Sequence, residues 1–194
     1  MVTWGLDVLK RAMDIGGAIV GLTVLSPLLL IIAMAVRIES PGPALHRSRR
    51  VGRNNQIFLM PKFRSMRTGA PEVATHLLVE PGHWITPLGA FLRRSSLDEL
   101  PQLWSVLKGD MSLVGPRPAL FNQDDLIGLR TAAGVQRLRP GLTGWAQIHG
   151  RDELPIDEKA VLDAEYLARQ SLGLDLMIIA RTSIAAFSGR HVRH

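Results

Sequence analysis

The sequence predicts an α+β protein that is mainly helical, in which an N-terminal re-entrant membrane hairpin of helices precedes a small domain rich in helices and loops. Two observations predict this architecture. Residues 15–36 form an apolar run without a charge, and the rest of the chain lacks the regular strand–helix alternation that builds a parallel sheet. The 194 residues therefore divide into a membrane-embedded segment, 1–37, and a membrane-associated domain, 38–194, with interfacial helices and little sheet.

As a straight helix the apolar run would be ~33 Å long, enough to cross a bilayer. Near its middle lie Ser26 and Pro27, and the proline removes a backbone hydrogen bond to the Thr23 carbonyl. Both flanks of the run are basic, and positive residues prefer the cytoplasmic side: Lys10, Arg11, Arg37, Arg47, Arg49, Arg50 and Arg53. We therefore favour a re-entrant helix, broken at Ser26-Pro27 with both ends in the cytoplasm, over a helix that spans the bilayer.

The segments after the apolar run are predicted from turn residues and periodicity. Residues 39–55 are expected to form a turn-rich, basic exit from the membrane, which suits acidic lipid headgroups. Residues 56–67 begin as a short strand, and 68–83 form a loop. Residues 97–108 form an amphipathic helix, because apolar residues recur there at helical spacing: Leu100, Leu103, Trp104 and Leu107.

The second half of the domain alternates turn-rich and helical segments. Residues 108–120 and 137–151 are rich in glycine and proline, and 137–151 cannot be one regular element. Residues 157–170 are predicted to be a helix with Asp163 and its other charged residues in solvent. Residues 174–188 are apolar on most faces, so this segment is expected to be buried or to lie on the membrane surface.

The composition limits the chemistry that the chain can perform. It carries a net charge of +6 and no cysteine, which favours an anionic partner and excludes disulfides, thiolate nucleophiles and cysteine zinc sites. The six histidines show no metal-ligand spacing. A phosphate-binding loop, a dinucleotide fingerprint, a nucleophile elbow and an H-E-x-x-H motif are all missing from the sequence.

Two arginines lie beside residues that restrict the backbone. Arg117 lies within Gly115-Pro116-Arg117-Pro118, and Arg139 precedes Pro140-Gly141. Prolines have little backbone freedom to lose on binding, and guanidinium groups bind phosphate oxygens in pairs. A Pro-Arg-Pro turn in a loop is more often structural, but several such arginines beside paired carboxylates favour a phosphate site.

Asp98 and Glu99 are paired carboxylates that follow directly on Arg93-Arg94. The local pattern Ser96-Leu97-Asp98-Glu99 is the S-x-x-E capping box of a helix start, and it accounts for both acids without any catalysis. The start of a helix also favours the ionised form of a carboxylate, which would keep Asp98 nucleophilic at neutral pH.

Together these stretches resemble the bacterial sugar transferases, the small monotopic polyprenyl-phosphate phosphoglycosyl transferases. The resemblance covers nearly the whole chain, and its most specific block is "RRSSLDELPQLWSVLKGDMSLVGPRP". The other matching stretches are "KRAMDI" before the Ser26-Pro27 break, "KFRSMR" at 62–67, "RPGLTGWAQIHGR" at 139–151 and "SLGLDLMII" at 171–179. Many members carry a further N-terminal membrane domain, and this chain, which begins at the hairpin, is expected to be the minimal form.

The resemblance implies that the domain 38–194 is a catalytic domain on the cytoplasmic face of the bacterial inner membrane. Its reaction would transfer a sugar-1-phosphate from a UDP-sugar to polyprenyl (undecaprenyl) phosphate and release UMP, as the first membrane step of a polysaccharide or glycoconjugate pathway. Asp98 would attack the β-phosphorus to form an aspartyl phosphosugar, and Asp98 and Glu99 would hold Mg²⁺. Glu99 would cap the helix, coordinate the metal or handle protons, and it could cap and coordinate in turn.

The resemblance and the need to offset phosphate charge identify the candidate substrate-binding residues: Lys62, Arg64, Arg93, Arg117 and Arg139. The expected partners are the UDP-sugar, polyprenyl phosphate and membrane lipid, and an oligomer is compatible with the sequence although nothing in it specifies one. An alternative is a membrane-anchored basic module that binds acidic lipid or nucleic acid. Nucleic acid is not expected, because the aromatic platforms for single strands are missing and Tyr166 is the only tyrosine. A scaffold that binds polyprenyl phosphate without catalysis is a third interpretation.

Overall fold

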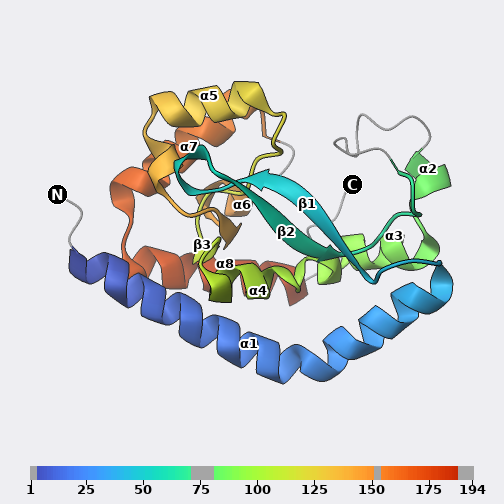
Figure 1. Ribbon diagram of the computed structural model, residues 1–194. Coiled ribbons are helices and arrows are strands. Elements are labelled where there is room, and N and C mark those ends of the chain that lie inside the picture. Colours follow the sequence, from blue (N-terminus) through green and yellow to red (C-terminus); the bar gives the residue numbers. More distant parts are fainter. Residues whose placement is uncertain (1–3, 71–80, 151–153, 188–194) are drawn as a thin grey trace.

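The computed structural model describes residues 4–70, 81–150 and 154–187 of the chain. Most of these residues are helical, and a long helix, α1 (Trp4–Glu39), runs along one side of a domain that contains two two-stranded sheets (Figure 1). This arrangement confirms the prediction of a mainly helical protein with little sheet.

The remaining elements are short. The first half of the domain contains β1 (Leu45–Val51), η1 (Arg53–Asn55), β2 (Ile57–Phe63), α2 (Pro81–Trp84), α3 (Pro87–Arg94), η3 (Leu97–Glu99) and α4 (Gln102–Lys108), where η denotes a 3₁₀ turn. The second half contains β3 (Ser112–Val114), α5 (Asp124–Ala132), η4 (Val135–Arg137), β4 (Gly141–Thr143), α6 (Trp145–Ile148), α7 (Ile156–Arg169) and α8 (Leu172–Phe187). β1 pairs antiparallel with β2, and β3 pairs parallel with β4.

The helix predicted at 157–170 and the strand at the start of 56–67 are confirmed. The helix predicted at 97–108 is confirmed only from Gln102 to Lys108, because residues 97–99 form the separate 3₁₀ turn η3. The basic segment 39–55 is different from its prediction. Residues 45–51 of that segment form strand β1, which pairs with β2 in continuous register from Leu45↔Phe63 to Val51↔Ile57. Its arginines hid the strand, because they do not follow the apolar–polar alternation of a half-buried strand. Of the predicted loop 68–83, residues 71–80 lie outside the described residues.

Helix α1 passes through Pro27 without interruption, although a break between two helices was predicted there. Figure 1 shows instead that α1 bends about half way along its length. The Ser26 hydroxyl donates a 2.8 Å hydrogen bond to the Thr23 carbonyl, the group from which proline removes its usual amide partner. The stretch Leu6–Glu39 is long and apolar enough to cross a membrane by length and composition.

Both arms of α1 pack against the same domain. On the first arm Ala18 belongs to a core cluster with Met60, Val106 and Met111. On the second arm Ile32 and Val36 pack in a cluster with Phe63 and Leu92. The strands and helices that follow the membrane segment therefore hold it at both ends.

The first arm approaches the domain closely because it carries glycines on the contact face. A Cβ on Gly17 would lie 2.7 Å from Leu113 Cδ1, and one on Gly21 would lie 3.0 Å from Leu103 Cδ1. Gly16, one residue away, has open space around it. The glycines on one face of α1 thus match the side chains of α4 and β3.

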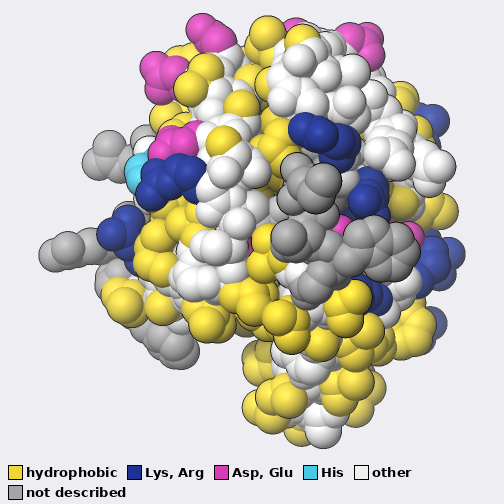
Figure 2. Space-filling view, turned by 90° about the vertical axis from the view of Figure 1, so that its left-hand side faces the viewer, with side chains coloured by type: hydrophobic (Ala, Val, Ile, Leu, Met, Phe, Trp, Pro, Cys, Tyr) yellow, Lys and Arg dark blue, Asp and Glu magenta, His cyan; other side chains and the backbone are white. Residues whose placement is uncertain are grey.

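The opposite face of α1 exposes large apolar side chains, among them Val20, Val24, Leu30 and Ile31, each more than half exposed. α8 adds Leu176 and Ile184, and α4 adds Trp104. Figure 2 shows a lower half of the molecule that is mainly hydrophobic. A contiguous apolar surface of this kind marks contact with a membrane or a partner, so it supports membrane association.

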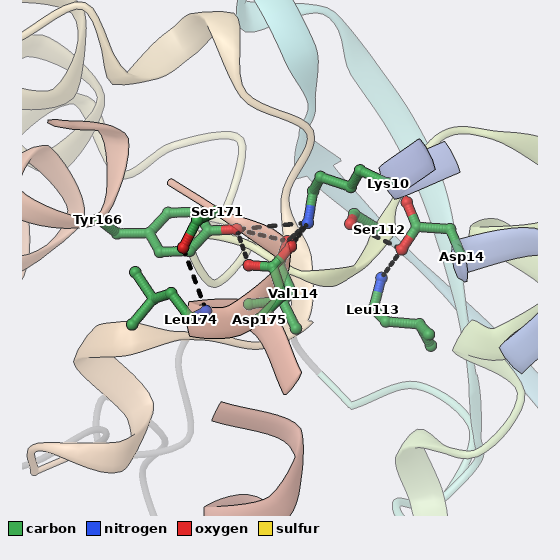
Figure 3. A network of polar contacts seen from close by, with 9 residues as sticks. All are labelled: Lys10, Asp14, Ser112, Leu113, Val114, Tyr166, Ser171, Leu174 and Asp175. Carbon is green, nitrogen blue, oxygen red and sulfur yellow. Dashed lines mark hydrogen bonds and ion pairs between the residues drawn. The ribbon is translucent and has the colours of Figure 1, made fainter. Parts of the chain in front are cut away.

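A buried polar network ties the start of α1 to α8 (Figure 3). Lys10 Nζ lies 2.6 Å from Asp175 Oδ2, and the Tyr166 hydroxyl donates a 2.6 Å hydrogen bond to Asp175 Oδ1. Burial and the charge of Asp175 raise the pKa of Tyr166, which keeps it protonated as a donor. Asp14 accepts from the Ser112 hydroxyl and the Leu113 amide. Lys10, one of the basic residues that flank the apolar run, is therefore a structural cation inside this network.

Candidate active site

The two adjacent carboxylates lie in η3, the 3₁₀ turn between α3 and α4. Asp98 is buried, with 8% of its surface exposed. Ser96 has a left-handed backbone (φ 56°) and its side chain makes no capping hydrogen bond. The predicted capping box is therefore wrong, because the left-handed residue turns the Ser96 side chain away and frees Glu99 for other partners.

Glu99 is held by two basic residues from distant parts of the chain. Lys62 Nζ, on β2, donates to Glu99 Oε1 at 2.7 Å, and Arg117 Nη2 donates to the same oxygen at 3.1 Å. Arg117 Nη1 lies 3.5 Å from Oε2. Burial raises the pKa of Glu99, but the charges of Arg117 and Lys62 outweigh it and hold that pKa well below its usual range. Glu99 is thus a firmly ionised, positioned carboxylate.

The pKa of Asp98 is shifted in the opposite direction, upward. Burial raises its pKa, Glu99 raises it further, and the opposing charges of Lys62, Arg93 and Arg117 do not fully compensate. The expected helix start is a short 3₁₀ turn, and burial raises the pKa of Asp98 in spite of it. Two neighbouring carboxyl groups are therefore tuned apart, a pattern typical of catalytic acid pairs.

Arg93 completes the positive surroundings of the dyad. It lies in the last turn of α3, and its Nε donates to the Ser65 hydroxyl at 2.7 Å. Burial lowers its pKa and the charge of Asp98 raises it, so the two side chains influence each other directly. The structure thus brings together Lys62, Arg93 and Arg117 around Asp98 and Glu99, five of the predicted site residues.

Arg64 lies elsewhere in the structure. Its buried guanidinium donates to the carbonyls of Pro41 and Ser40 at 2.7 and 2.6 Å, where α1 ends. Substrate binding by Arg64 stays a prediction that this geometry does not favour, since its donors already satisfy the free carbonyls of a helix end. Arg139 also lies away from the dyad, and its Nε donates to the Gly109 carbonyl beyond the far end of α4 at 3.0 Å.

Two residues that the sequence did not single out position the Gly-Pro-Arg-Pro turn. Arg130 Nη1, on α5, donates to the Arg117 carbonyl at 2.8 Å, and Arg130 Nη2 lies 2.6 Å from Asp163 Oδ2 on α7. The prediction that Asp163 lies in solvent is wrong, because this carboxylate is buried. The turn also packs tightly on the segment that follows Arg139, where a Cβ on Gly115 would lie 2.4 Å from the Arg139 carbonyl oxygen.

The dyad is the place where the residues present could hold Mg²⁺. In residues 4–70, 81–150 and 154–187 no group of three or more histidine or acidic side chains is arranged for a metal ion. Magnesium commonly uses only one or two carboxylates and takes its other oxygens from substrate phosphates and water. Asp98 and the Oε2 atom of Glu99 fit that manner of binding, provided that a phosphorylated substrate supplies the remaining oxygens.

Chemically, the site offers a buried carboxylate that can attack, an ionised carboxylate beside it, and three cations that can hold phosphate oxygens. Such an arrangement suits transfer of a phosphoryl group. The comparisons with known proteins agree with this assignment.

Residues 6–189 match the family model described as bacterial sugar transferase. A UDP-glucose:undecaprenyl-phosphate glucose-1-phosphate transferase of Xanthomonas campestris pv. campestris is 42% identical over 175 residues, which cover 86% of this chain and 36% of that protein. An undecaprenyl-phosphate glucose phosphotransferase of Komagataeibacter xylinus is 40% identical over 89% of this chain and 35% of its own length. The chain thus spans about a third of these relatives.

A shorter relative is covered more fully. The exopolysaccharide production protein ExoY of Rhizobium meliloti (strain 1021) is 37% identical over 190 residues, which cover 89% of this chain and 83% of that protein. The family-model match over residues 6–189 extends through β2, η3 and the turn at Arg117, so it includes every residue gathered at the dyad. The chain therefore belongs to the bacterial sugar transferase family.

Proposed function

We propose that the protein transfers a sugar-1-phosphate from a UDP-sugar to polyprenyl phosphate, with undecaprenyl phosphate as the bacterial acceptor, and releases UMP. The observation that carries this proposal is the geometry of the acidic pair: Asp98 is buried beside Glu99, which Lys62 and Arg117 hold by ion pairs of 2.7 and 3.1 Å. The names of the Xanthomonas and Komagataeibacter relatives describe transfer of this kind to undecaprenyl phosphate. Such a product begins the membrane stage of a polysaccharide or glycoconjugate pathway.

In the first step the Asp98 carboxylate oxygen forms a bond to the β-phosphorus of the UDP-sugar. The bond from that phosphorus to the bridging oxygen breaks, and UMP leaves with the oxygen and its electron pair. The product on the protein is an aspartyl phosphosugar. Covalent catalysis by a carboxylate divides one difficult displacement into two easier ones.

In the second step a phosphate oxygen of the polyprenyl phosphate bonds to the same phosphorus, and the Asp98 carboxylate leaves. The lipid then carries a diphosphate-linked sugar, and Asp98 returns to its starting state. Both steps bring anions onto a carboxylate, so the positive charges of Lys62, Arg93 and Arg117 are needed to offset repulsion. Glu99 keeps Lys62 and Arg117 in place for this purpose.

Mg²⁺ held by Asp98 and Glu99 together with the diphosphate would supply further positive charge where negative charge develops. Because Glu99 already bonds Lys62 and Arg117 in the described structure, a bound ion would share this carboxylate with them. Removing the metal by chelation is expected to abolish turnover and to leave the fold in place, since the ion pairs of the dyad do not require it.

The membrane topology that we propose is re-entrant, with both ends of α1 and the catalytic domain on the cytoplasmic face. The packing of both arms of α1 on one domain supports it: Ala18 and Val36, from opposite arms, are both buried against that domain. A helix spanning straight across would carry one of these residues to the other side of the bilayer. From Leu6 to Glu39 the helix is also ~50 Å long, well beyond the ~30 Å hydrocarbon core.

The topology can be tested with single cysteines, since the chain contains none. Ala12→Cys and Gln56→Cys place a thiol at exposed positions before and after the apolar part of α1. We expect both to react with a membrane-impermeant maleimide only when the cytoplasmic face is accessible. Labelling from opposite faces would establish a spanning helix and overturn the re-entrant proposal.

The activity can be tested with purified protein, polyprenyl phosphate, Mg²⁺ and a panel of UDP-sugars, with UMP release as the readout. We expect UMP with at least one donor and a lipid-linked diphosphate sugar as the second product. If no donor gave UMP while the protein still bound acidic lipid vesicles, a membrane-anchored basic binding module would be the better description.

A further inference from the structure

Four arginines line a recess at the opposite end of α4 from the dyad. Arg11 comes from α1, Arg53 from η1, Arg137 from η4, and Arg139 from the turn before β4. About 10 Å of helix α4 separates this arginine recess from η3. The recess is therefore a second basic site, distinct from the one that gathers Lys62, Arg93 and Arg117.

In the described part of the chain, backbone carbonyls accept the hydrogen bonds that hold these arginines in place. Arg53 Nε donates to the Arg137 carbonyl at 2.8 Å, Arg137 Nε to the Gly134 carbonyl at 3.0 Å, and Arg139 Nε to the Gly109 carbonyl at 3.0 Å. Within the described part of the chain, the terminal nitrogens of these three guanidinium groups make no hydrogen bond or ion pair. Each arginine is thus anchored by one edge and presents its two remaining nitrogens as donors.

The positive charge of the recess is not neutralised within it. Burial lowers the pKa of Arg139, the charges of Arg53 and Arg11 lower it further, and Asp14 and Asp7 only partly oppose them. Asp14 is also engaged by the Ser112 hydroxyl and the Leu113 amide. Like charges placed together in this way repel one another unless an anion joins them.

Two glycines at positive φ leave space for the closely placed arginine side chains. A Cβ on Gly134 (φ +76°) would lie 3.0 Å from Arg137 Nη2, and one on Gly109 (φ +100°) would lie 3.3 Å from Arg11 Nη2. Arg11 itself donates from Nη1 to the Val106 carbonyl at 2.7 Å and from Nη2 to the Leu107 carbonyl at 2.8 Å, so it contributes charge to the recess while its terminal nitrogens are held by α4. The backbone is therefore shaped to bring the guanidinium groups together.

The recess borders the start of α1, next to exposed apolar residues of the same helix. It is lined by Asp7 and Arg11 on the first turns of α1, while Val8 and Leu9 on the same turns are exposed apolar residues. Figure 2 views the molecule from the end where α1 begins and shows basic side chains above the hydrophobic lower half.

We propose that the arginine recess binds the phosphate group of an anionic lipid headgroup, at a site separate from the dyad. Guanidinium donors suit phosphate oxygens, and the position beside the apolar face of α1 favours a phosphate that is attached to lipid over one in solution. The bound lipid would fix the first arm of α1 at the interface. The proposal depends on membrane association and not on the transfer reaction, so it can be tested without turnover.

The test is native mass spectrometry of the full chain from a neutral detergent, titrated with phosphatidylglycerol, with phosphatidylcholine as the zwitterionic comparison. Arg53→Gln/Arg137→Gln removes two exposed cations of the recess. Its matched control, Lys159→Gln/Arg169→Gln, removes two cations from α7. At about 1 kcal/mol for each basic residue near a lipid surface, we expect the recess variant to bind phosphatidylglycerol at least about tenfold more weakly, and the control within about twofold of the unaltered chain.

Inorganic phosphate in competition separates the two sources of the phosphate group. If millimolar phosphate bound to the recess and the variant lost only that binding, the site would be one for free phosphate and the lipid assignment would be overturned. Equal phosphatidylglycerol binding by the recess variant, the control and the unaltered chain would overturn the site itself. Thermal melting of each variant checks that it is folded. Arg117→Gln alters the dyad and not the recess, so we expect it to bind phosphatidylglycerol as tightly as the unaltered chain.

Discussion

Removing the charge of Asp98 and removing the charge of Glu99 should change the stability of the fold in opposite directions. Asp98→Asn and Glu99→Gln each replace a carboxylate by an amide of the same shape. Glu99 accepts from Lys62 at 2.7 Å and from Arg117 at 3.1 Å, so Glu99→Gln leaves both cations without their counter-ion. Asp98 is buried at a net unfavourable charge, so Asp98→Asn removes a penalty.

The loss of stability expected for Glu99→Gln follows from how exposed its two partners, Lys62 and Arg117, are. The Lys62 side chain is 16% exposed and that of Glu99 18%, close to a buried pair, whose disruption costs roughly 3–5 kcal/mol. The Arg117 side chain is 40% exposed, so its pair adds at most about 1 kcal/mol. Because the amide of glutamine still accepts one hydrogen bond, we expect a net loss of about 2–3 kcal/mol. This corresponds to a melting temperature lower by roughly 5–10 °C for a chain of this size.

The sign of each pH dependence follows from the direction of each pKa shift. Asp98 has a raised pKa, so its penalty is full above that pKa and fades as the pH falls toward ~3.9, the unfolded value. The advantage of Asp98→Asn should therefore shrink with falling pH. Glu99 has a lowered pKa, so its stabilisation is complete above ~4.3 and is lost only below that value. The loss in Glu99→Gln should be the same at pH 7 and pH 5.

The assay is thermal unfolding of the detergent-solubilised full chain by intrinsic fluorescence, at pH 7 and pH 5, for the two variants and the unaltered protein. We expect Asp98→Asn to melt at or above the unaltered protein and Glu99→Gln clearly below it. Both variants should lose activity, Asp98→Asn completely. Equal destabilisation by the two substitutions would refute the assignment of opposite roles to the two carboxylates.

Three further predictions follow from the packing and the site. Gly17→Leu should lower stability by about 1–3 kcal/mol in thermal unfolding, because its side chain meets Leu113, whereas Gly16→Leu should be neutral. Arg130→Gln should reduce kcat more than it changes KM for the UDP-sugar, since it releases the Arg117 carbonyl; an unchanged kcat would remove Arg130 as a positioning residue. The pH profile of kcat/KM should fall on the acid side at a higher pH than a solvent-exposed aspartate would give, because Asp98 must be ionised to attack and its pKa is raised.

Much of the site could be predicted from the sequence because several of its residues belong to short sequence motifs that are recognisable by themselves. Asp98 and Glu99 are adjacent, and Arg117 lies in a turn fixed by two prolines, so neither depends on distant contacts to be noticed. Lys62 and Arg93 were identified by resemblance, and the structure brings their side chains to the dyad from β2 and α3.

The roles of the other arginines could not be predicted, because the sequence does not show whether a guanidinium group binds a substrate phosphate or a backbone carbonyl. Arg64 satisfies the end of α1 and Arg139 lies in the recess, and only the three-dimensional path of the chain separates them from Arg93. Arg130 and Asp163 were missed for a related reason. Their pairing joins residues 33 positions apart, on helices that appear solvated when each is considered alone.

The fold was predicted where periodicity is strong and missed where charge masks it. The helices at α4 and α7 follow from apolar spacing, whereas the arginines of β1 concealed a strand. The bend of α1 has a local cause in Pro27, but its continuity does not, because the packing of both arms on one domain keeps the helix intact across the proline.

The most direct test of the central claim is to mix the protein with its UDP-sugar and Mg²⁺ in the absence of any polyprenyl phosphate. We predict a rapid release of UMP that stops at about one molecule per protein chain, together with a peptide containing Asp98 whose mass is increased by one phosphosugar. Asp98→Asn should give neither. If UMP appeared only after the lipid acceptor was added, and no modified peptide formed, transfer would be direct and Asp98 would not be the nucleophile.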